Sequence, residues 1–278
     1  MKNLSKVFIL LGLAVTVFGG GGLATYLLFI KKPDTHRSVS SQLVVTPALD
    51  QGISMLRHAC QQLAKGEKSN AQQTLISLIQ NFPGSSKSEE AKQLLGDINI
   101  QAFFSLEFGF DRVEYTVNRG DSIAKIASKT KSSPELIFKT NELDSLTIHI
   151  GQKLIIPVDR FGFFIDLKHQ DVTLLNNGTF FRWYKPEEFK LPPKAVAGYF
   201  KVYEKIAWAA GRRVAFGDKN YFGSSRWIVL NQSDVMLFSE TNPQSPNIQK
   251  PNFGIMLAAS DMEEVFALIT KDTSVIIQ

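Results

Sequence analysis

The chain has 278 residues, a formal net charge of +5, 44% apolar residues and 21% charged residues. This length allows two or three domains, and this composition is typical of globular protein and excludes general disorder. The mild charge, without a basic run interleaved with aromatic residues, excludes an evident nucleic-acid surface. A single cysteine excludes an internal disulfide. The four histidines are scattered and none has metal-ligand spacing, so we predict no metal site and no cofactor.

The amino-terminal stretch 7–30 contains no charged residue, and lysines flank it on both sides. Because about 20 apolar residues cross the hydrocarbon core of a bilayer, residues 1–32 are predicted to form a transmembrane signal anchor. A cleaved signal peptide is the alternative, since Gly22-Leu-Ala24 has the spacing of a cleavage site. The apolar run continues beyond that site, which favours the uncleaved anchor. Residues 33–46 are polar and serine-rich, and are predicted to be a short linker.

Residues 47–106 are predicted to be helical, with helices over about 48–64 and 69–80 and a third that starts near 86–88. The spacing of their small and apolar residues resembles a tetratricopeptide-type helical hairpin. Fewer than three such repeats are hardly stable alone, so the segment is expected to pack on a neighbour or a partner. Cys60, on the first helix, is expected to be buried as a small apolar residue.

The stretch 113–157 is predicted to form a strand, two short helices and a closing strand. Gly120 makes a turn after the first strand, and Asp121 is expected to cap the first helix. Ser133-Pro134 starts the second helix, and residues 151–157 form a turn and the last strand. This βααβ module closely resembles a LysM domain, on the residues Tyr115, Val117, Gly120, Asp121, Ser122, Ile126, Ala127, Leu136, Asn141, Gly151, Gln152, Leu154 and Pro157.

LysM domains bind N-acetylglucosamine polymers, namely peptidoglycan or chitin, in a groove between the loop after the first strand and the loop before the second. The resemblance therefore implies a glycan site here. An alternative remains open for each residue: Gly120 serves the turn, Asp121 the helix cap, and Ile123 the core. The glycan-binding candidates that the resemblance assigns are Gly120, Asp121, Ser122 and Ile123 in the first loop, and Leu146, Ile148, Ile150 and Gly151 in the second.

From Phe161 onward the sequence changes to short segments rich in β-forming residues. Asn177-Gly178 is a strong signal for a two-residue hairpin turn. Ser260 is expected to cap the one clear helix, with Glu263 completing a capping box. The strands are expected over 163–167, 171–175, 179–184, 198–203, 227–230, 234–239 and 273–277.

Residues 160–278 resemble a YkuD-type L,D-transpeptidase domain, on the segments 174–178, 197–202, 222–230 and 260–277. Enzymes of that family use a cysteine thiolate that a histidine activates, together with donors for the oxyanion. The family carries these groups in the motifs His-Gly-Thr and Ser-His-Gly-Cys-Ile/Val-Arg. At the corresponding positions this chain has Ser239 and Phe253 in place of the histidines, Ile255 in place of the cysteine and Leu257 in place of the arginine.

No histidine follows His169, so this region holds no local base of that kind. A serine hydroxyl would need such a base to act as a nucleophile. We therefore predict no catalytic residue and a pseudoenzyme, in which apolar side chains fill the former site like a core. The alternative is an active transpeptidase or peptidase of peptidoglycan that uses displaced residues.

Together these features predict a multidomain α+β protein: a transmembrane helix, a short helical hairpin region, a βααβ LysM module, and a mainly-β transpeptidase-like domain. The expected partners are peptidoglycan strands, the cytoplasmic membrane through residues 7–30, and a wall-synthesis or division protein through the helical segment. Both flanks of the apolar run are basic, so charge does not decide its orientation. A wall-binding module requires the bulk of the chain to lie outside the bacterial cytoplasmic membrane.

Overall fold

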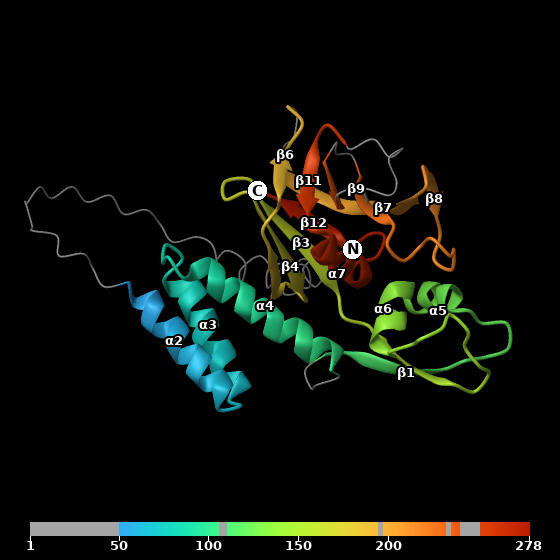
Figure 1. The fold of residues 1–278 in the computed structure, drawn as a ribbon, viewed down its shortest axis with the longest axis horizontal. Helices are drawn as coiled ribbons and strands as arrows, with labels where there is room; N and C mark the ends of the chain where they lie inside the picture. The colour runs from blue at the N-terminus through green and yellow to red at the C-terminus, as the bar shows by residue number, and fades with distance from the viewer. Residues whose placement is uncertain (1–49, 106–109, 194–196, 232–234, 240–250) are drawn as a thin grey trace, which may run out of the picture. The chain divides into compact units, whose positions relative to one another are not determined.

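The computed structural model describes residues 50–105, 110–193, 197–231, 235–239 and 251–278 (Figure 1). The chain divides into two compact units, and the division falls between Ala91 and Lys92. The predicted anchor and linker lie outside the described residues. Among the described helices, none has the length and apolar character needed to cross a bilayer.

The first unit contains the predicted helical hairpin, whose two helices contact each other along one face. Its buried side chains include Leu56 on the first helix and Leu75 and Leu78 on the second. Asp50 is the N-cap: its carboxylate accepts hydrogen bonds from the backbone N–H of Gly52 (3.0 Å) and of Ser86 (2.9 Å). The helices of the segment are α2 (Gln51–Ala64), α3 (Lys68–Asn81) and α4 (Ser88–Phe104), which crosses the division between the units.

Cys60 is exposed, so the expectation that it would be buried is wrong. The buried residues of α2 are Gly52, Leu56 and Ala59, which recur at helical spacing on one face. Cys60 follows Ala59 by one position, which is about 100° further around the helix. The apolar neighbours of Cys60 in the sequence therefore face the core, while Cys60 itself does not.

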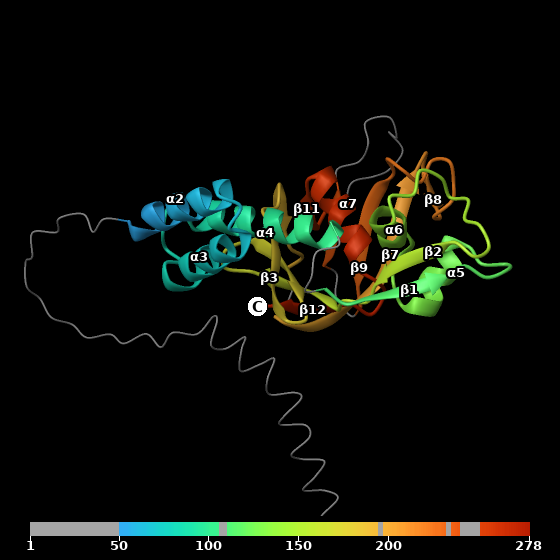
Figure 2. The same ribbon diagram turned by 90° about the horizontal axis from the view of Figure 1, so that it is seen from below.

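The LysM-like module has the predicted βααβ order. Its strands β1 and β2 run antiparallel beside each other, with Tyr115 opposite Leu154 (Figure 2). The module has its own small core, which includes Ile126, Ile137 and Ile156. Its elements are β1 (Arg112–Thr116), α5 (Ile123–Thr130), α6 (Pro134–Thr140) and β2 (Lys153–Pro157).

Asn141 joins the end of α6 to β2. Its side-chain oxygen accepts the backbone N–H of Ile155 (2.7 Å), and its side-chain NH₂ donates to the Ile155 carbonyl (2.8 Å). The same NH₂ group donates to the carbonyl of Ile137 (2.9 Å). One amide thus satisfies backbone groups of both a helix and a strand, which explains an asparagine at this position.

We call residues 160–278 the C-terminal lobe. Its strands form one large mixed sheet. Its strands follow the order β5-β4-β3-β12-β7-β9-β10-β11-β6, and β8 pairs with β7. Two pairs are parallel, β12 with β3 and β10 with β11, and α7 lies against β9 and β10. The elements are β3 (Phe161–Asp166), β4 (Asp171–Asn176), β5 (Thr179–Tyr184), β6 (Glu188–Lys190), β7 (Gly198–Ala209), β8 (Arg212–Val214), β9 (Ser225–Leu230), β10 (Met236–Ser239), β11 (Gly254–Leu257), α7 (Ala259–Leu268) and β12 (Ser274–Ile277).

The predicted hairpin turn is confirmed: β4 pairs with β5, and Asn177 and Gly178 both have positive φ, at 48° and 81°. Such a pair of left-handed residues matches the twist of the two strands. The strands β6, β8 and β11 had no sequence prediction. They are three or four residues long, too short for an alternating pattern to identify.

The expected capping box on α7 is wrong. The N-cap is Ala258, with no side-chain hydrogen bond, and Ser260 lies inside the first turn. Glu263 is not free to reach back to the helix start, because its carboxylate binds the guanidinium of Arg226 (Nε to Oε1, 2.8 Å). The apolar face was predicted correctly: Met262, Val265 and Phe266 are all buried.

Candidate functional site

The two loops that the LysM resemblance assigns to the glycan site lie side by side. The backbone N–H of Gly151 donates to the carbonyl of Val117, and the N–H of Val117 donates to the carbonyl of Gln152, both at 2.9 Å. These bonds continue the β1–β2 ladder past the ends of the strands. Gly120 and Gly151 have φ of 84° and 85°, a backbone conformation that favours glycine. Both glycines therefore shape the loops.

The loop before β2 presents apolar side chains to solvent. Ile150 is 71% exposed and Leu146 is 37% exposed, while Ile148 is half-buried. Opposite them, Gly120 and Ser122 are exposed. Exposed apolar side chains that gather in one place mark ligand-binding grooves more often than single ones do, and Leu146 and Ile150 lie in the same loop.

Two of the assigned residues have structural roles. Ile123 is only 2% exposed and belongs to the core of the module. The sequence also predicted that Asp121 caps α5, and this is wrong: the N-cap is Ser122, whose hydroxyl accepts the backbone N–H of Lys125 (3.3 Å). The Asp121 side chain is only 3% exposed and points into the loop.

The Asp121 carboxylate holds the first loop in shape. It accepts hydrogen bonds from the Lys129 ammonium (2.6 Å), the backbone N–H of Asn118 (2.9 Å) and the Tyr115 hydroxyl (2.9 Å). These donors, Lys129 foremost, lower the pKa of Asp121 to about 2. The ammonium of Lys125 also binds the loop, at the carbonyl of Gly120 (2.8 Å).

Sequence reasoning missed the part played by Lys125 and Lys129. Their spacing on α5 is four residues, so both side chains leave the helix on the same face. That face lies next to the loop. Because α5 directly follows the loop in the sequence, the spacing of the two lysines could have suggested these contacts. The first loop is therefore preorganised by contacts from the helix behind it.

In the C-terminal lobe, the structure gathers the positions that correspond to the transpeptidase motifs. The strands β10 and β11 are parallel neighbours, with Ser239 opposite Leu257 and Leu237 opposite Ile255. Phe253 precedes β11 and is 38% exposed. Residues far apart in the family motifs thus come together at adjacent strand positions here.

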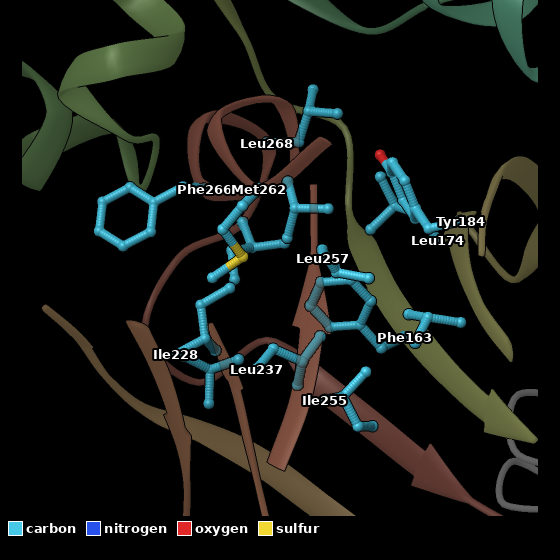
Figure 3. Close-up of a cluster of buried hydrophobic side chains, with 14 of the residues drawn as sticks. Phe163, Leu174, Tyr184, Ile228, Leu237, Ile255, Leu257, Met262, Phe266 and Leu268 are labelled. Atoms are coloured by element: carbon cyan, nitrogen blue, oxygen red, sulfur yellow. The ribbon is translucent and has the colours of Figure 1, made fainter. Parts of the chain in front are cut away.

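The two apolar replacements lie in the core of the lobe. Ile255 and Leu257 have no exposed surface. Figure 3 shows both side chains among other buried apolar groups from β3, β9, β10 and α7. The labelled neighbours in the figure include Phe163, Ile228, Leu237, Met262 and Phe266.

Ser239 is buried as well. It is 3% exposed, and its hydroxyl oxygen accepts the backbone N–H of Arg226 (3.1 Å). Gly254, which the family motif shares, is required by packing: an added Cβ would lie 2.8 Å from the Met236 carbonyl and from the Phe238 ring, at a φ of 142°. The glycine therefore survives for a structural reason.

Arg226 is the largest polar group buried beside these positions, and no pattern in the sequence indicates it. Its side chain is 1% exposed and is paired with Glu263. Its guanidinium lies 4.1 Å from the centre of the Tyr221 ring and 4.9 Å from that of Phe266, and it donates to the Ser224 hydroxyl (2.9 Å). The group is fully engaged as a structural element. Across the described ranges, no cluster of three or more His, Cys, Asp or Glu residues could hold a metal ion.

Comparison with known proteins gives one family match, the LysM domain, over residues 115–157. No curated protein matches the chain. Among solved structures, the chain is similar to an L,D-transpeptidase from Stackebrandtia nassauensis, with 16% identity, a TM-score of 0.31, and coverage of 43% of this chain and 55% of that one.

Two further solved structures are similar at the same level. A fused Zn-dependent amidase/peptidase/peptidoglycan-binding domain-containing protein from Clostridium acetobutylicum has 15% identity, a TM-score of 0.30, and coverage of 43% and 52%. L,D-transpeptidase 1 from Mycobacterium tuberculosis has 14% identity, a TM-score of 0.29, and coverage of 46% and 68%. The chain spans about half the length of the first two structures. The family match and the βααβ geometry agree on one segment: residues 115–157 are a LysM domain.

Proposed function

We propose that this protein is a cell-envelope protein that binds the glycan strands of peptidoglycan through its LysM domain. The observation that carries the proposal is the pair of adjoining loops, one held rigid by Asp121 and the other presenting Leu146 and Ile150 to solvent. A preformed surface loses little conformational entropy when it binds a ligand. The contact surface consists of Gly120 and Ser122 on one side and Leu146, Ile148, Ile150 and Gly151 on the other, with Asp121 and Ile123 as its support.

We further propose that the C-terminal lobe is a pseudoenzyme that serves as a binding or regulatory surface. The complete burial of Ile255 and Leu257 supports this, since a side chain of this size contributes about 1.5–3 kcal/mol when it is removed from water. A thiolate, an imidazole and a guanidinium at the same positions would contribute no such term and would need water or partners. The former site has become part of the core.

The proposed location is the outer side of the bacterial cytoplasmic membrane, with a single-pass anchor in residues 7–30. The uncharged run of 24 residues supports the anchor, and the LysM domain supports the orientation. The helical hairpin is proposed to bind a protein of wall synthesis or division.

Co-sedimentation of the full chain with purified peptidoglycan tests the glycan proposal. The Leu146→Ser/Ile150→Ser double variant is expected to remain in the supernatant, because it removes the exposed apolar contacts. Val113→Ser is the matched control: Val113 is 45% exposed in the same domain but lies in β1, away from the two loops, and this variant is expected to sediment normally. Equal sedimentation of all three proteins would refute the proposed site.

A second experiment separates the pseudoenzyme from an enzyme with displaced residues. The full chain is incubated with muropeptides and with a carbapenem, and the products and the protein mass are measured. We expect unchanged muropeptides and no acyl adduct on the C-terminal lobe. A crosslinked or shortened muropeptide that disappears in the Ser239→Ala variant would establish the enzyme instead.

A further inference from the structure

The solvent-facing side of the C-terminal sheet carries aromatic groups that the core does not explain. Tyr199 is 76% exposed and Tyr203 is 59% exposed, the most exposed tyrosines of the described chain. Both lie on β7, with Lys201 between them. Tyr199 and Lys201 are at alternate positions and leave the strand on one side, and Tyr203 lies at a β-bulge between Val202 and Glu204, where its side chain is also exposed. That side is opposite to the buried Val202.

The strand register extends this surface across two more strands. Tyr199 stands opposite Ile276 of β12, and Ile276 stands opposite Phe164 of β3. Both Ile276 and Phe164 are half-buried, whereas their neighbours Val275 and Phe163 are buried on the other face, with α7. Since neighbouring strands are about 4.8 Å apart, the three side chains form a flat row about 10 Å wide.

The next row of residues on the same face, Lys201, Ser274 and Gly162, is flat and carries a positive charge. Lys201 stands opposite Ser274, which stands opposite Gly162, so two of its three positions carry little or no side chain. Lys271 adds a second cation, with its ammonium 5.7 Å from the centre of the Tyr203 ring. Neither Lys201 nor Lys271 forms an ion pair with a described residue. We call Phe164, Tyr199, Lys201, Tyr203, Lys271 and Ile276 the tyrosine face.

We propose that the tyrosine face is a second binding surface for peptidoglycan, whose stem peptides carry carboxylates. The flat apolar row fits the C–H face of sugar rings, and the tyrosine hydroxyls supply hydrogen-bond partners for sugar hydroxyls. The ammonium groups of Lys201 and Lys271, which form no ion pair with a described residue, complement the carboxylates that peptidoglycan carries on its stem peptides. The choice of this polymer rests on the proposed function of the LysM domain.

The size and charge of the face argue against other occupants. A stable protein interface buries about 800 Å² on each partner and involves about 20–30 residues, far more than this face offers. Stable attraction to an anionic membrane takes a cluster of about 4–8 basic residues, and the face has two. Once the LysM domain holds the polymer, binding of the tyrosine face to the same polymer is intramolecular. A weak contact is then enough to raise the overall affinity.

Co-sedimentation of the full chain in detergent with purified peptidoglycan tests the inference. The Tyr199→Ser/Tyr203→Ser variant is expected to bind about 10-fold more weakly than the wild type, through lost avidity. Its binding to soluble chitooligosaccharide, which is neutral and reaches the LysM domain alone, is expected to be unchanged. Ile53→Ser/Ile76→Ser is the control, since these residues are exposed to 42% and 38% in the helical hairpin.

Substitution of Lys201 and Lys271 tests the same inference independently of the tyrosines. Lys201→Gln/Lys271→Gln is expected to weaken binding and to reduce its salt dependence, and peptidoglycan with amidated carboxyl groups is expected not to distinguish this variant from the wild type. Binding equal to wild type in both the tyrosine and the lysine variants would overturn the inference. A change of oligomeric state in the tyrosine variant, measured by light scattering, would identify a self-association surface and would also overturn it.

The failure of this inference can be told from failure of the proposed function. If the Leu146→Ser/Ile150→Ser variant binds like the wild type while the tyrosine variant does not, the LysM site is refuted and the tyrosine face stands. If the tyrosine and lysine variants both bind like the wild type while the Leu146→Ser/Ile150→Ser variant does not, the tyrosine face is refuted and the LysM site stands. Unfolding followed by tryptophan fluorescence checks the tyrosine and lysine variants, because the three tryptophans (Trp183, Trp208 and Trp227) all lie in the C-terminal lobe, and circular dichroism checks the variants of the LysM domain and the helical hairpin.

Discussion

The apolar loop residues Leu146 and Ile150 are exposed in the LysM domain, whereas apolar residues at two motif positions of the C-terminal lobe are buried. Ile150 is 71% exposed on a loop, whereas Ile255 has no exposed surface and packs in the largest core of the molecule. The same residue type is therefore exposed on a loop in one region and fills the interior in the other. Sequence motifs identified both positions, but only the tertiary structure shows which of them is exposed to solvent and which supports the fold.

The charged groups of the two regions also differ in where they lie: beside an exposed loop in the LysM domain and, for Arg226, in the interior of the C-terminal lobe. In the LysM domain, Asp121 and Lys129 are used to shape a loop that remains open to solvent. In the C-terminal lobe, Arg226 pairs with Glu263 beside β10 and lies over the rings of Tyr221 and Phe266. The Asp121–Lys129 pair fixes the shape of an exposed loop, whereas pairing with Glu263 stabilises the buried guanidinium of Arg226.

The largest expected contrast is in chemical accessibility. In a Cys60→Ser background, which removes the exposed native thiol, Ile150→Cys is expected to react with iodoacetamide about 1,000-fold or more faster than Ile255→Cys, because Ile255 is reached only when the core opens. Rates of mass increase under native conditions measure this. In urea the two variants should react alike, and similar native rates would end the contrast between the regions.

A buried charge should give the next largest effect. Leu257→Arg is expected to destabilise the C-terminal lobe by about 3–5 kcal/mol, because an unpaired charge replaces a fully buried side chain. Ile150→Arg is expected to change stability by no more than about 0.5 kcal/mol. Urea unfolding followed by tryptophan fluorescence reports the lobe, and circular dichroism reports the whole chain.

Leu257→Met is the control for that experiment, since a volume-conserving apolar change should cost less than about 1.5 kcal/mol. A stable Leu257→Arg protein would mean that solvent or a partner carboxylate reaches this position. That outcome would reopen the possibility of a catalytic groove.

The smallest expected effect is a pH dependence of the first LysM loop. The pKa of Asp121 is lowered from 3.8 to about 2, so its carboxylate stabilises the folded loop above pH 3.8 and this contribution is lost as the pH falls toward 2. Hydrogen exchange at the Asn118 amide, which donates to Asp121, should therefore accelerate over this range.

Asp121→Asn is expected to remove that acid transition, because the amide does not titrate. Asp144→Asn, at an exposed position in the same domain, should leave the transition in place. An unchanged exchange profile in Asp121→Asn would show that the loop does not depend on this carboxylate.

Local patterns predicted much of the fold. The βααβ order, the Asn177-Gly178 turn and the apolar face of α7 follow from residues close together in the sequence, and all three are confirmed. The errors also have local causes. Ser122 rather than Asp121 caps α5, since both are good capping residues and only the loop contacts of Asp121 decide between them.

What the sequence determined by itself was the identity of the LysM domain and the absence of a cysteine and a histidine from the transpeptidase-like motif positions. These are statements about residue types at fixed spacing. Only the tertiary structure decided that Ile255 and Leu257 are interior, because their burial depends on parallel pairing of β10 with β11 and on α7. It likewise decided that Tyr199, Ile276 and Phe164 share one row, since the register of strands distant in sequence is set by packing and not by local pattern.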